Sequence, residues 1–183
     1  DEYDSAFFDK GPKFLHYRPR TALLTSIEFD HADIYRDLDH VLSGFRAFIA
    51  LLPPDGLLVA NADDPLVAAE AAKAPCRVAY YGLEDGADWT ARHLVFGDAW
   101  TRLTIQRASG PPIPVETPLY GRHNVSNLLA VSAVADRLDI PPDTFRQAVR
   151  SFRGVKRRQE VRGERRGVTV IDDFAHHPTA VRE

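Results

Sequence analysis

Two short polar segments early in the chain combine a carboxylate with an imidazole. Glu2 lies in the opening DEYD, and His31 lies in EFDHAD, at the end of an apolar run of β type at 20–28. Both group types are suitable ligands for a divalent ion, and Mg²⁺ prefers oxygen ligands and keeps several waters. Parallel α/β sheets gather ligand sites at the carboxyl ends of strands. The alternative is a polar turn at a helix start, because short polar motifs often occur by chance.

A second candidate site lies at a predicted helix start, in the sequence GRHNVSN. Gly121 allows a tight turn, and His123, Asn124 and Asn127 fall within about the first turn of the helix. Asn124 and Asn127 are three residues apart and therefore share one face. Their amides carry donors and an acceptor that match the amino group and a ring nitrogen of adenine. Helix capping is the alternative role for Asn124, but it does not account for the second Asn and the His.

A third candidate site combines a basic stretch with a polar turn. Arg158 lies in KRRQE at 156–160, and Asp173 and His176 lie in DDFAHHPT at 172–179, after a predicted strand. An arginine can fork onto phosphate oxygens, and a carboxylate can accept hydrogen bonds from ribose hydroxyls. The alternatives are a solvated linker for the basic stretch and an ordinary polar turn for the second segment.

The elements that must position these side chains follow from the hydrophobic pattern. The predicted order is a strand at 20–28, a helix at 37–52, a strand at 56–64, a helix at 65–74 and a strand at 76–82. Asp37 is the expected N-cap of the first helix, Pro53-Pro54 end it, and Pro65 suits the first turn of the second. This alternation predicts a mainly parallel sheet with crossover helices.

The second half of the chain changes character. Residues 88–119 alternate between apolar and polar and contain turn signals, which predicts an antiparallel extension of the sheet. Helices are expected at about 123–138 and 142–152, and the charged stretch 153–167 is interpreted as a linker. From residue 168 onward we expect a strand, a loop and the start of a helix. The predicted fold class is α/β: a mainly parallel central sheet with flanking helices and a small antiparallel extension.

The composition excludes several classes of function. The 183 residues carry 23 Lys and Arg against 26 Asp and Glu, a net charge of −3 that gives no support for binding nucleic acid or an acidic membrane. The apolar runs are too short to span a bilayer. Cys76 is the sole cysteine, which suits a reducing, cytoplasmic compartment. Because methionine is absent and the opening is abrupt, we interpret the sequence as an excerpt of a longer chain.

Taken together and in this order, five segments resemble motifs of the Mur ligase superfamily. They are DEYD at 1–4, EFDHAD at 28–33, GRHNVSN at 121–127, KRRQE at 156–160 and DDFAHHPT at 172–179, and they cover essentially the whole chain. The resemblance implies that 1–158 form the superfamily's central ATPase domain, with a fold like that of P-loop NTPases. It implies that 159–183 hold a linker and the start of the C-terminal domain. The superfamily's G-x-x-G-K-[ST] phosphate loop is missing and is expected upstream, so we expect the chain alone to be inactive.

The resemblance also implies a cofactor set and residue roles. ATP and Mg²⁺ are the implied cofactors, with Glu2 and His31 as the metal ligands and Arg158 beside the phosphates; these three are the implied catalytic residues. The residues implied to bind the nucleotide are His123, Asn124, Asn127, Arg158, Asp173 and His176. Of these, Asn124 and Asn127 would contact adenine, and Asp173 would contact the ribose. The missing N- and C-terminal domains of the same protein are implied partners.

Within the superfamily, the segments 1–20 and 26–35 most resemble the branch that works in peptidoglycan recycling. That branch joins UDP-N-acetylmuramate to the tripeptide L-Ala-γ-D-Glu-meso-diaminopimelate through an acyl phosphate. The runner-up is the branch that adds L-alanine to UDP-N-acetylmuramate. Two alternatives of other kinds remain: a non-catalytic nucleotide-binding or interaction module, and a ligase like folylpolyglutamate synthase, against which the DDFAHHP turn argues.

Overall fold

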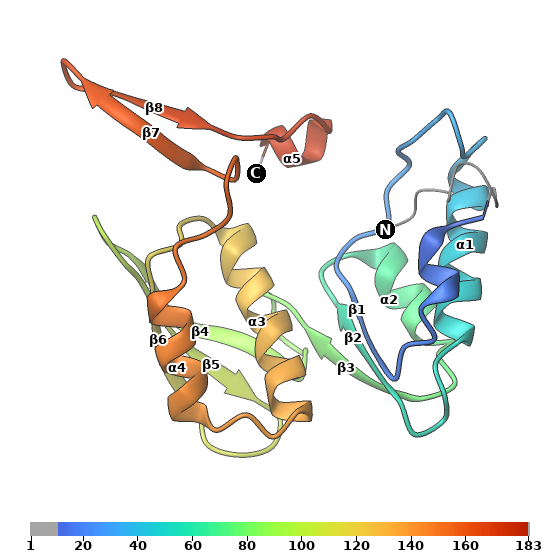
Figure 1. The fold of residues 1–183 in the computed structure, drawn as a ribbon. Helices are drawn as coiled ribbons and strands as arrows, with labels where there is room; N and C mark the ends of the chain where they lie inside the picture. Colours follow the sequence, from blue (N-terminus) through green and yellow to red (C-terminus); the bar gives the residue numbers. More distant parts are fainter. Residues whose placement is uncertain (1–10, 183) are drawn as a thin grey trace.

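A computed structural model describes residues 11–182 of the chain (Figure 1). Six strands form one sheet in the order β1-β2-β3-β4-β5-β6. They are β1 (Thr21–Leu24), β2 (Leu57–Asn61), β3 (Arg77–Tyr81), β4 (Trp89–Phe96), β5 (Thr101–Arg107) and β6 (Ile113–Thr117). The first three pair in parallel, and β3 meets β4 in a short parallel contact. The strands β4, β5 and β6 pair antiparallel. The predicted parallel sheet with an antiparallel extension is therefore confirmed.

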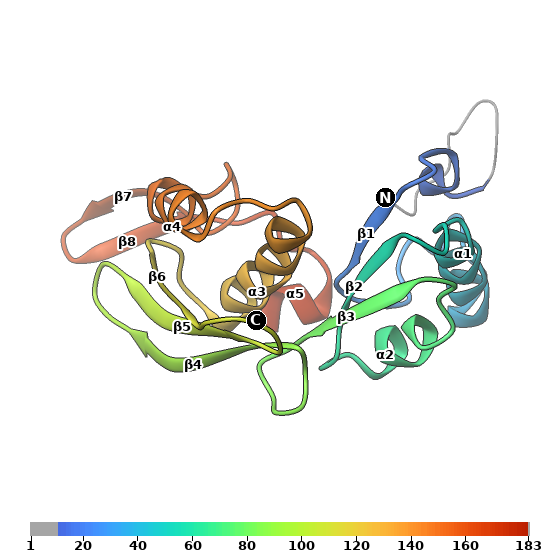
Figure 2. The same cartoon turned by 90° about the horizontal axis from the view of Figure 1, so that it is seen from below.

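Helices cover both faces of the sheet (Figure 2). Helices α1 (Leu38–Ala50) and α2 (Pro65–Ala71) follow β1 and β2, while α3 (Arg122–Arg137) and α4 (Pro142–Ser151) follow β6. The central strand β2 divides its side chains between the two layers: Leu58 packs with the α1–α2 core, and Val59 packs with the α3 core. Because both faces of β2 are covered, its pattern is a continuous apolar run.

The helix starts agree with the sequence-based expectations in the first half of the chain. Asp37 caps α1 by accepting a hydrogen bond of 2.8 Å from the backbone N–H of His40. Pro65 lies at the first position of α2, where its missing N–H costs nothing. Asp64 caps the same helix by accepting from the N–H groups of Leu66 and Val67. These caps fix the direction in which each helix leaves the carboxyl end of its strand.

Helices α1 and α2 are joined by a buried carboxylate. Glu70 is 4% exposed. It accepts hydrogen bonds from the Arg46 guanidinium at 3.0 and 2.8 Å and from Lys73 Nζ at 2.8 Å. The Arg46 hydrogen bond is the main reason that the pKa of Glu70 falls from 4.5 to about 2, against the opposing effect of burial. The charged form of Glu70 therefore stabilises the folded state.

We expect Glu70→Gln to destabilise the protein at neutral pH. A carboxyl group whose folded-state pKa lies below its unfolded value adds stability above the unfolded pKa and loses it as the pH falls through the folded pKa. The window here runs from about pH 5 down to about pH 2. Because Arg46 and Lys73 are 48% and 58% exposed, we expect a loss of about 2 kcal/mol rather than the full linkage value.

Chemical unfolding at pH 7 and at pH 3 measures this effect. The difference between wild type and Glu70→Gln should be large at pH 7 and should shrink as the pH is lowered. Glu84→Gln is the matched control, because the Glu84 side chain is 79% exposed and its ion pair with Arg122 is long, at 3.6 Å. An equal loss at both pH values would contradict the proposed role of the Glu70 charge.

The C-terminal part differs from the expectation for 153–167. We expected that stretch to be a linker, but it contains strand β7 (Glu160–Arg165), which pairs antiparallel with β8 (Val168–Asp172) in a separate two-stranded sheet. Arg166 and Gly167 form the connection, both with positive φ, 53° and 75°. Such two-residue turns direct the chain back into a hairpin. The hairpin is largely exposed, so it lacks the apolar pattern by which strands are predicted.

Two further differences concern the first part of the described chain. The strand expected at 20–28 ends already at Leu24, and the remaining residues form a loop that leads to His31. A short 3-10 helix, η1 (Lys13–His16), precedes β1 and buries Phe14 against α1. None of the helices within residues 11–182 is long and apolar enough to cross a membrane.

Candidate functional site

A large cleft of about 1640 Å³ opens beside the carboxyl ends of β1 and β2. Its other walls come from α3, from parts of α1 and α4, and from residues within 154–159 and 173–180. Six of the predicted site residues line it: His31, His123, Asn124, Asn127, Arg158 and Asp173. Glu2 lies outside the described residues. The cleft thus brings together side chains from three segments that are far apart in the sequence.

His31 has a strained backbone conformation in the loop that follows β1, where it lines the cleft. Its φ is +57°, a left-handed value that costs a non-glycine residue about 1 kcal/mol or more. A tight turn imposes this conformation, since the His31 carbonyl accepts from Ile34 and Tyr35 N–H at 2.8 and 3.0 Å. The His31 N–H donates to Asp30 Oδ1 at 2.7 Å. This hydrogen bond, followed by the charges of His31 and other nearby histidines, lowers the pKa of Asp30 despite partial burial.

The side chains at this turn, Asp30 and His31, suit a metal ion that is held only partly by protein ligands better than one enclosed by them. Within residues 11–182, no three His, Cys, Asp or Glu side chains gather closely enough to hold a metal by themselves. Mg²⁺ does not need such a cage, because it is usually held by one or two side chains together with phosphate oxygens and waters. His31 beside an ionised Asp30, on the wall of an open cleft, is compatible with that mode.

The first turn of α3 presents an amide and an imidazole to the cleft. Gly121 has a φ of +94°, and a Cβ there would lie 2.6 Å from the His123 ring. Asn124 Nδ2 donates to the Tyr120 carbonyl at 2.7 Å, which holds this amide in one orientation. His123 Nδ1 is buried and has no hydrogen-bond partner among the described residues. A buried polar atom without a partner is costly, so this atom marks His123 as a candidate for contact with a ligand.

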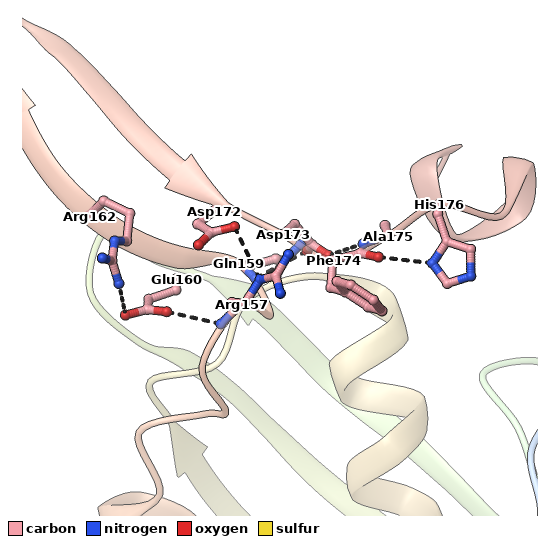
Figure 3. A network of polar contacts seen from close by, with 9 residues as sticks. All are labelled: Arg157, Gln159, Glu160, Arg162, Asp172, Asp173, Phe174, Ala175 and His176. Atoms are coloured by element: carbon pink, nitrogen blue, oxygen red, sulfur yellow. Dashed lines mark hydrogen bonds and ion pairs between the residues drawn. The ribbon is translucent and has the colours of Figure 1, made fainter. Parts of the chain in front are cut away.

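The basic stretch at 156–160 and the polar turn at 172–179 contact each other through backbone hydrogen bonds (Figure 3). Asp173 accepts hydrogen bonds from the N–H groups of Gln159 at 3.1 Å and Ala175 at 2.8 Å. Phe174 N–H donates to the Arg157 carbonyl at 2.8 Å, and the Arg157 guanidinium lies 4.6 Å from the Phe174 ring centre. The loop before β7 and the segment after β8 therefore form one junction.

Asp173 is kept ionised at this junction. The Ala175 N–H is the main reason that the pKa of Asp173 is lowered, with desolvation opposing and the Gln159 N–H, Arg158 and His123 adding to the effect. An ionised carboxylate accepts hydrogen bonds from hydroxyl groups without donating any. Asp173 and Arg158 both line the cleft. Asp173 can accept hydrogen bonds from hydroxyl groups of a ligand, and the Arg158 guanidinium can bind an anionic group.

The segment between β8 and helix α5 (Pro178–Arg182) contributes every second residue to the cleft. Asp173, Ala175 and His177 line it, whereas His176 is exposed and does not, and Thr179 and Ala180 of α5 line it as well. His176 Nδ1 lies 3.1 Å from the Phe174 carbonyl oxygen. The alternation is that of an extended chain, whose successive side chains point in opposite directions. The structure thus brings His177 into the cleft at a place where the sequence motif pointed to His176.

Sequence reasoning missed a group of polar residues at the end of β2. Asp63 accepts from the Leu83 N–H at 2.6 Å, and Asn61 Nδ2 donates to the Thr25 carbonyl at 3.0 Å. Asp64, besides capping α2, accepts from the Ile27 N–H at 3.2 Å. These side chains tie together the loops that follow β1, β2 and β3. The signal was present, because a polar run directly after a buried parallel strand marks the ligand-binding edge of a sheet.

Known proteins resemble this chain in sequence and in fold. Residues 9–135 match the Mur ligase middle domain. The chain is 43% identical over 167 residues to a UDP-N-acetylmuramate–L-alanine ligase of Rubrobacter xylanophilus, covering 91% of this chain and 36% of that protein. It is 38% identical over 182 residues to the UDP-N-acetylmuramate–L-alanyl-γ-D-glutamyl-meso-2,6-diaminoheptandioate ligase of Escherichia coli, covering 99% and 39%.

A solved structure of a Mur ligase has a similar fold. The crystal structure of a murein peptide ligase from Psychrobacter arcticus superimposes with a TM-score of 0.76 at 34% sequence identity, covering 99% of this chain and 37% of that one. The chain therefore spans a little over a third of the length of the relatives it matches.

Proposed function

The chain belongs to the Mur ligase family, and on this premise we propose that it is part of a longer ATP-dependent ligase that forms an amide bond. The observation that supports the proposal is the cleft, which six residues from separate motifs line. We propose that 1–158 form the middle, ATP-binding domain and that 159–183 begin the next domain. The separate two-stranded sheet of β7 and β8 supports this division.

The proposed nucleotide site uses the wall formed by α3 for the base. Asn124 and Asn127 read the amino group and a ring nitrogen of adenine, and the buried His123 Nδ1 gains a partner beside the base. Asp173 accepts from the ribose hydroxyls, and Arg158 binds phosphate oxygens. His176 stays a proposed nucleotide contact, although His177 is the residue that lines the cleft.

The proposed phosphate end of the site lies at the carboxyl ends of the parallel strands. Glu2 and His31 are the residues that we propose to hold Mg²⁺, which supplies positive charge at the phosphates when bound. Arg158, which also lines the cleft, adds a fixed positive charge. Because every reactant here is anionic, positioning and neutralisation of charge contribute most of the catalysis.

The proposed reaction has two steps. A carboxylate oxygen of UDP-N-acetylmuramate attacks the γ-phosphorus of ATP, which gives an acyl phosphate and ADP. The free amine of the second substrate then attacks the acyl carbon, so that an amide forms and inorganic phosphate leaves. We place this reaction in peptidoglycan recycling and in the cytoplasm, where the single cysteine suits the reducing conditions.

We propose the tripeptide L-Ala-γ-D-Glu-meso-diaminopimelate as the amine substrate and L-alanine as the second candidate. The E. coli relative, named for the tripeptide, matches 99% of this chain, which includes the opening residues. The R. xylanophilus relative, named for L-alanine, has the higher identity over a slightly shorter region. The two candidates share the nucleotide site and differ in the amine.

A competition assay separates these two candidates. The full-length enzyme is given UDP-N-acetylmuramate, ATP and Mg²⁺ with equal concentrations of both amines, and the two products are quantified. We expect kcat/KM to be at least about tenfold higher for the tripeptide, since a site built for a larger substrate gains binding energy that L-alanine cannot supply. Preferential incorporation of L-alanine would assign the chain to the alanine-adding branch and leave the nucleotide site unaffected.

A further inference from the structure

The carboxylate of Glu28 connects two segments that line the cleft. Glu28 lies in the loop after β1, three residues before His31. Its Oε2 accepts a hydrogen bond from Thr179 Oγ1 at 2.6 Å and lies 3.4 Å from His177 Nδ1. Both partners are about 150 residues further along the chain, at the start of helix α5 (Pro178–Arg182). In the view of Figure 2, α5 lies between α3 and the parallel half of the sheet.

From this geometry we propose that Glu28 is a positioning residue that holds the stretch Asp173–Thr179 across the cleft. The stretch is fixed at its other end by the junction with Gln159. Two points of attachment define the path of residues 173–177 and the start of α5, and the contacts of Glu28 are the second point. The distance between His31 on one wall and Asp173 on the other then depends on Glu28.

The chemistry at Glu28 suits a contact that can form and break. Its side chain is 39% exposed and that of His177 is 26% exposed, so neither group is deeply desolvated. A hydrogen bond to a charged acceptor at such a site changes an equilibrium between two conformations by about tenfold. That factor is small compared with the equilibrium constant for folding, but it is enough to change the fraction of molecules in which the segment is held in place. Glu28 is therefore expected to act on the placement of the segment and hardly on the stability of the domain.

The consequence for nucleotide binding rests on the proposed function, whereas the contact itself does not. If Asp173 binds the ribose, only molecules with the segment held in place bind the nucleotide fully. A lower population of that conformation then weakens the apparent affinity for the nucleotide by the same factor as the population falls. The KM for ATP should then rise while kcat stays closer to the wild-type value. A purely structural role would lower stability instead and would leave the ratio of kcat to KM nearly unchanged.

Hydrogen exchange in the full-length protein tests the contact without relying on activity. Backbone amides of 173–182 are followed by mass spectrometry at labelling times from milliseconds to seconds, with helix α1 as the internal reference. We expect Glu28→Ala to speed exchange in 173–182 by about tenfold and to leave α1 unchanged. Thr179→Val should speed exchange by a smaller factor, because the contact between Glu28 and His177 remains. The double variant should exchange no faster than Glu28→Ala, because both changes remove the same hydrogen bond.

Two variants sharpen the test. Glu28→Gln keeps an oxygen that accepts from Thr179 and should restore most of the protection. Asp33→Ala removes an exposed carboxylate from the same loop and should leave exchange at the wild-type rate. Exchange in 173–182 that is unchanged by Glu28→Ala would overturn the proposal. A wild-type protein that forms no amide product would contradict the proposed function, and the exchange result would still decide the role of Glu28.

Discussion

Replacing His31 by alanine in the full-length enzyme is expected to lower kcat by at least about 100-fold. His31 lines the cleft from the loop after β1, where we propose that its imidazole helps to hold the ion that neutralises the phosphates. A group of this kind acts most strongly where charge builds up in the transition state. The free energy of unfolding should change by no more than about 2 kcal/mol, because alanine meets the same left-handed φ of +57° as histidine.

Steady-state kinetics and thermal unfolding on the same preparation separate catalysis from stability. His31→Asn is a useful second variant, since asparagine tolerates the left-handed conformation and still lacks the imidazole. It should be as inactive as the alanine variant and at least as stable. If both variants kept near-normal kcat and lost only thermal stability, His31 would be a residue of the turn and nothing more.

Asn127→Ala is expected to raise the KM for ATP by about 10- to 30-fold with little change in kcat. The side chain is exposed on the face of α3 that lines the cleft, so it is free to bind the adenine edge. The base is remote from the reacting phosphorus, and a contact made equally in the ground state and the transition state changes KM rather than kcat. Stability should not fall, since alanine is a better helix former than asparagine.

Asn124→Ala is the informative comparison. Asn124 Nδ2 also donates to the Tyr120 carbonyl, so its removal should weaken both nucleotide binding and the start of α3. Equilibrium binding of ATP and GTP by the two variants, with unfolding curves alongside, measures both effects. Wild-type affinity in Asn127→Ala would place the base elsewhere in the cleft.

The first half of the fold was predictable because its rules are local. Asp37 and Asp64 precede apolar repeats of helical spacing, and the apolar run of β2 ends in polar residues, so boundaries can be placed within a few positions. The hairpin of β7 and β8 was not predictable from apolar pattern, since both strands are mostly exposed. The turn between the two strands has Arg166 at a positive φ. Glycine or asparagine at that position is the usual sequence signal of a hairpin turn, and arginine is not.

The residue types of the site were predictable, but part of its geometry was not. The motif with two adjacent histidines does not say which one faces the cleft, because that depends on the phase of an extended segment fixed by the contacts of Asp173 and Thr179. The positioning role of Glu28 was equally hidden. It depends on a contact between residues about 150 positions apart, and a single sequence holds no record of such pairs.

Transfer of an isotope from the sugar substrate to phosphate tests the central claim most directly. UDP-N-acetylmuramate with ¹⁸O in both oxygens of its lactyl carboxylate is incubated with the full-length enzyme, ATP, Mg²⁺ and the tripeptide, and the released phosphate is analysed by mass spectrometry. We predict one ¹⁸O in each phosphate, because the oxygen that attacks phosphorus stays with it when the amine attacks the acyl carbon. Phosphate without ¹⁸O, or bound nucleotide without any amide product, would contradict an ATP-dependent ligase that acts through an acyl phosphate.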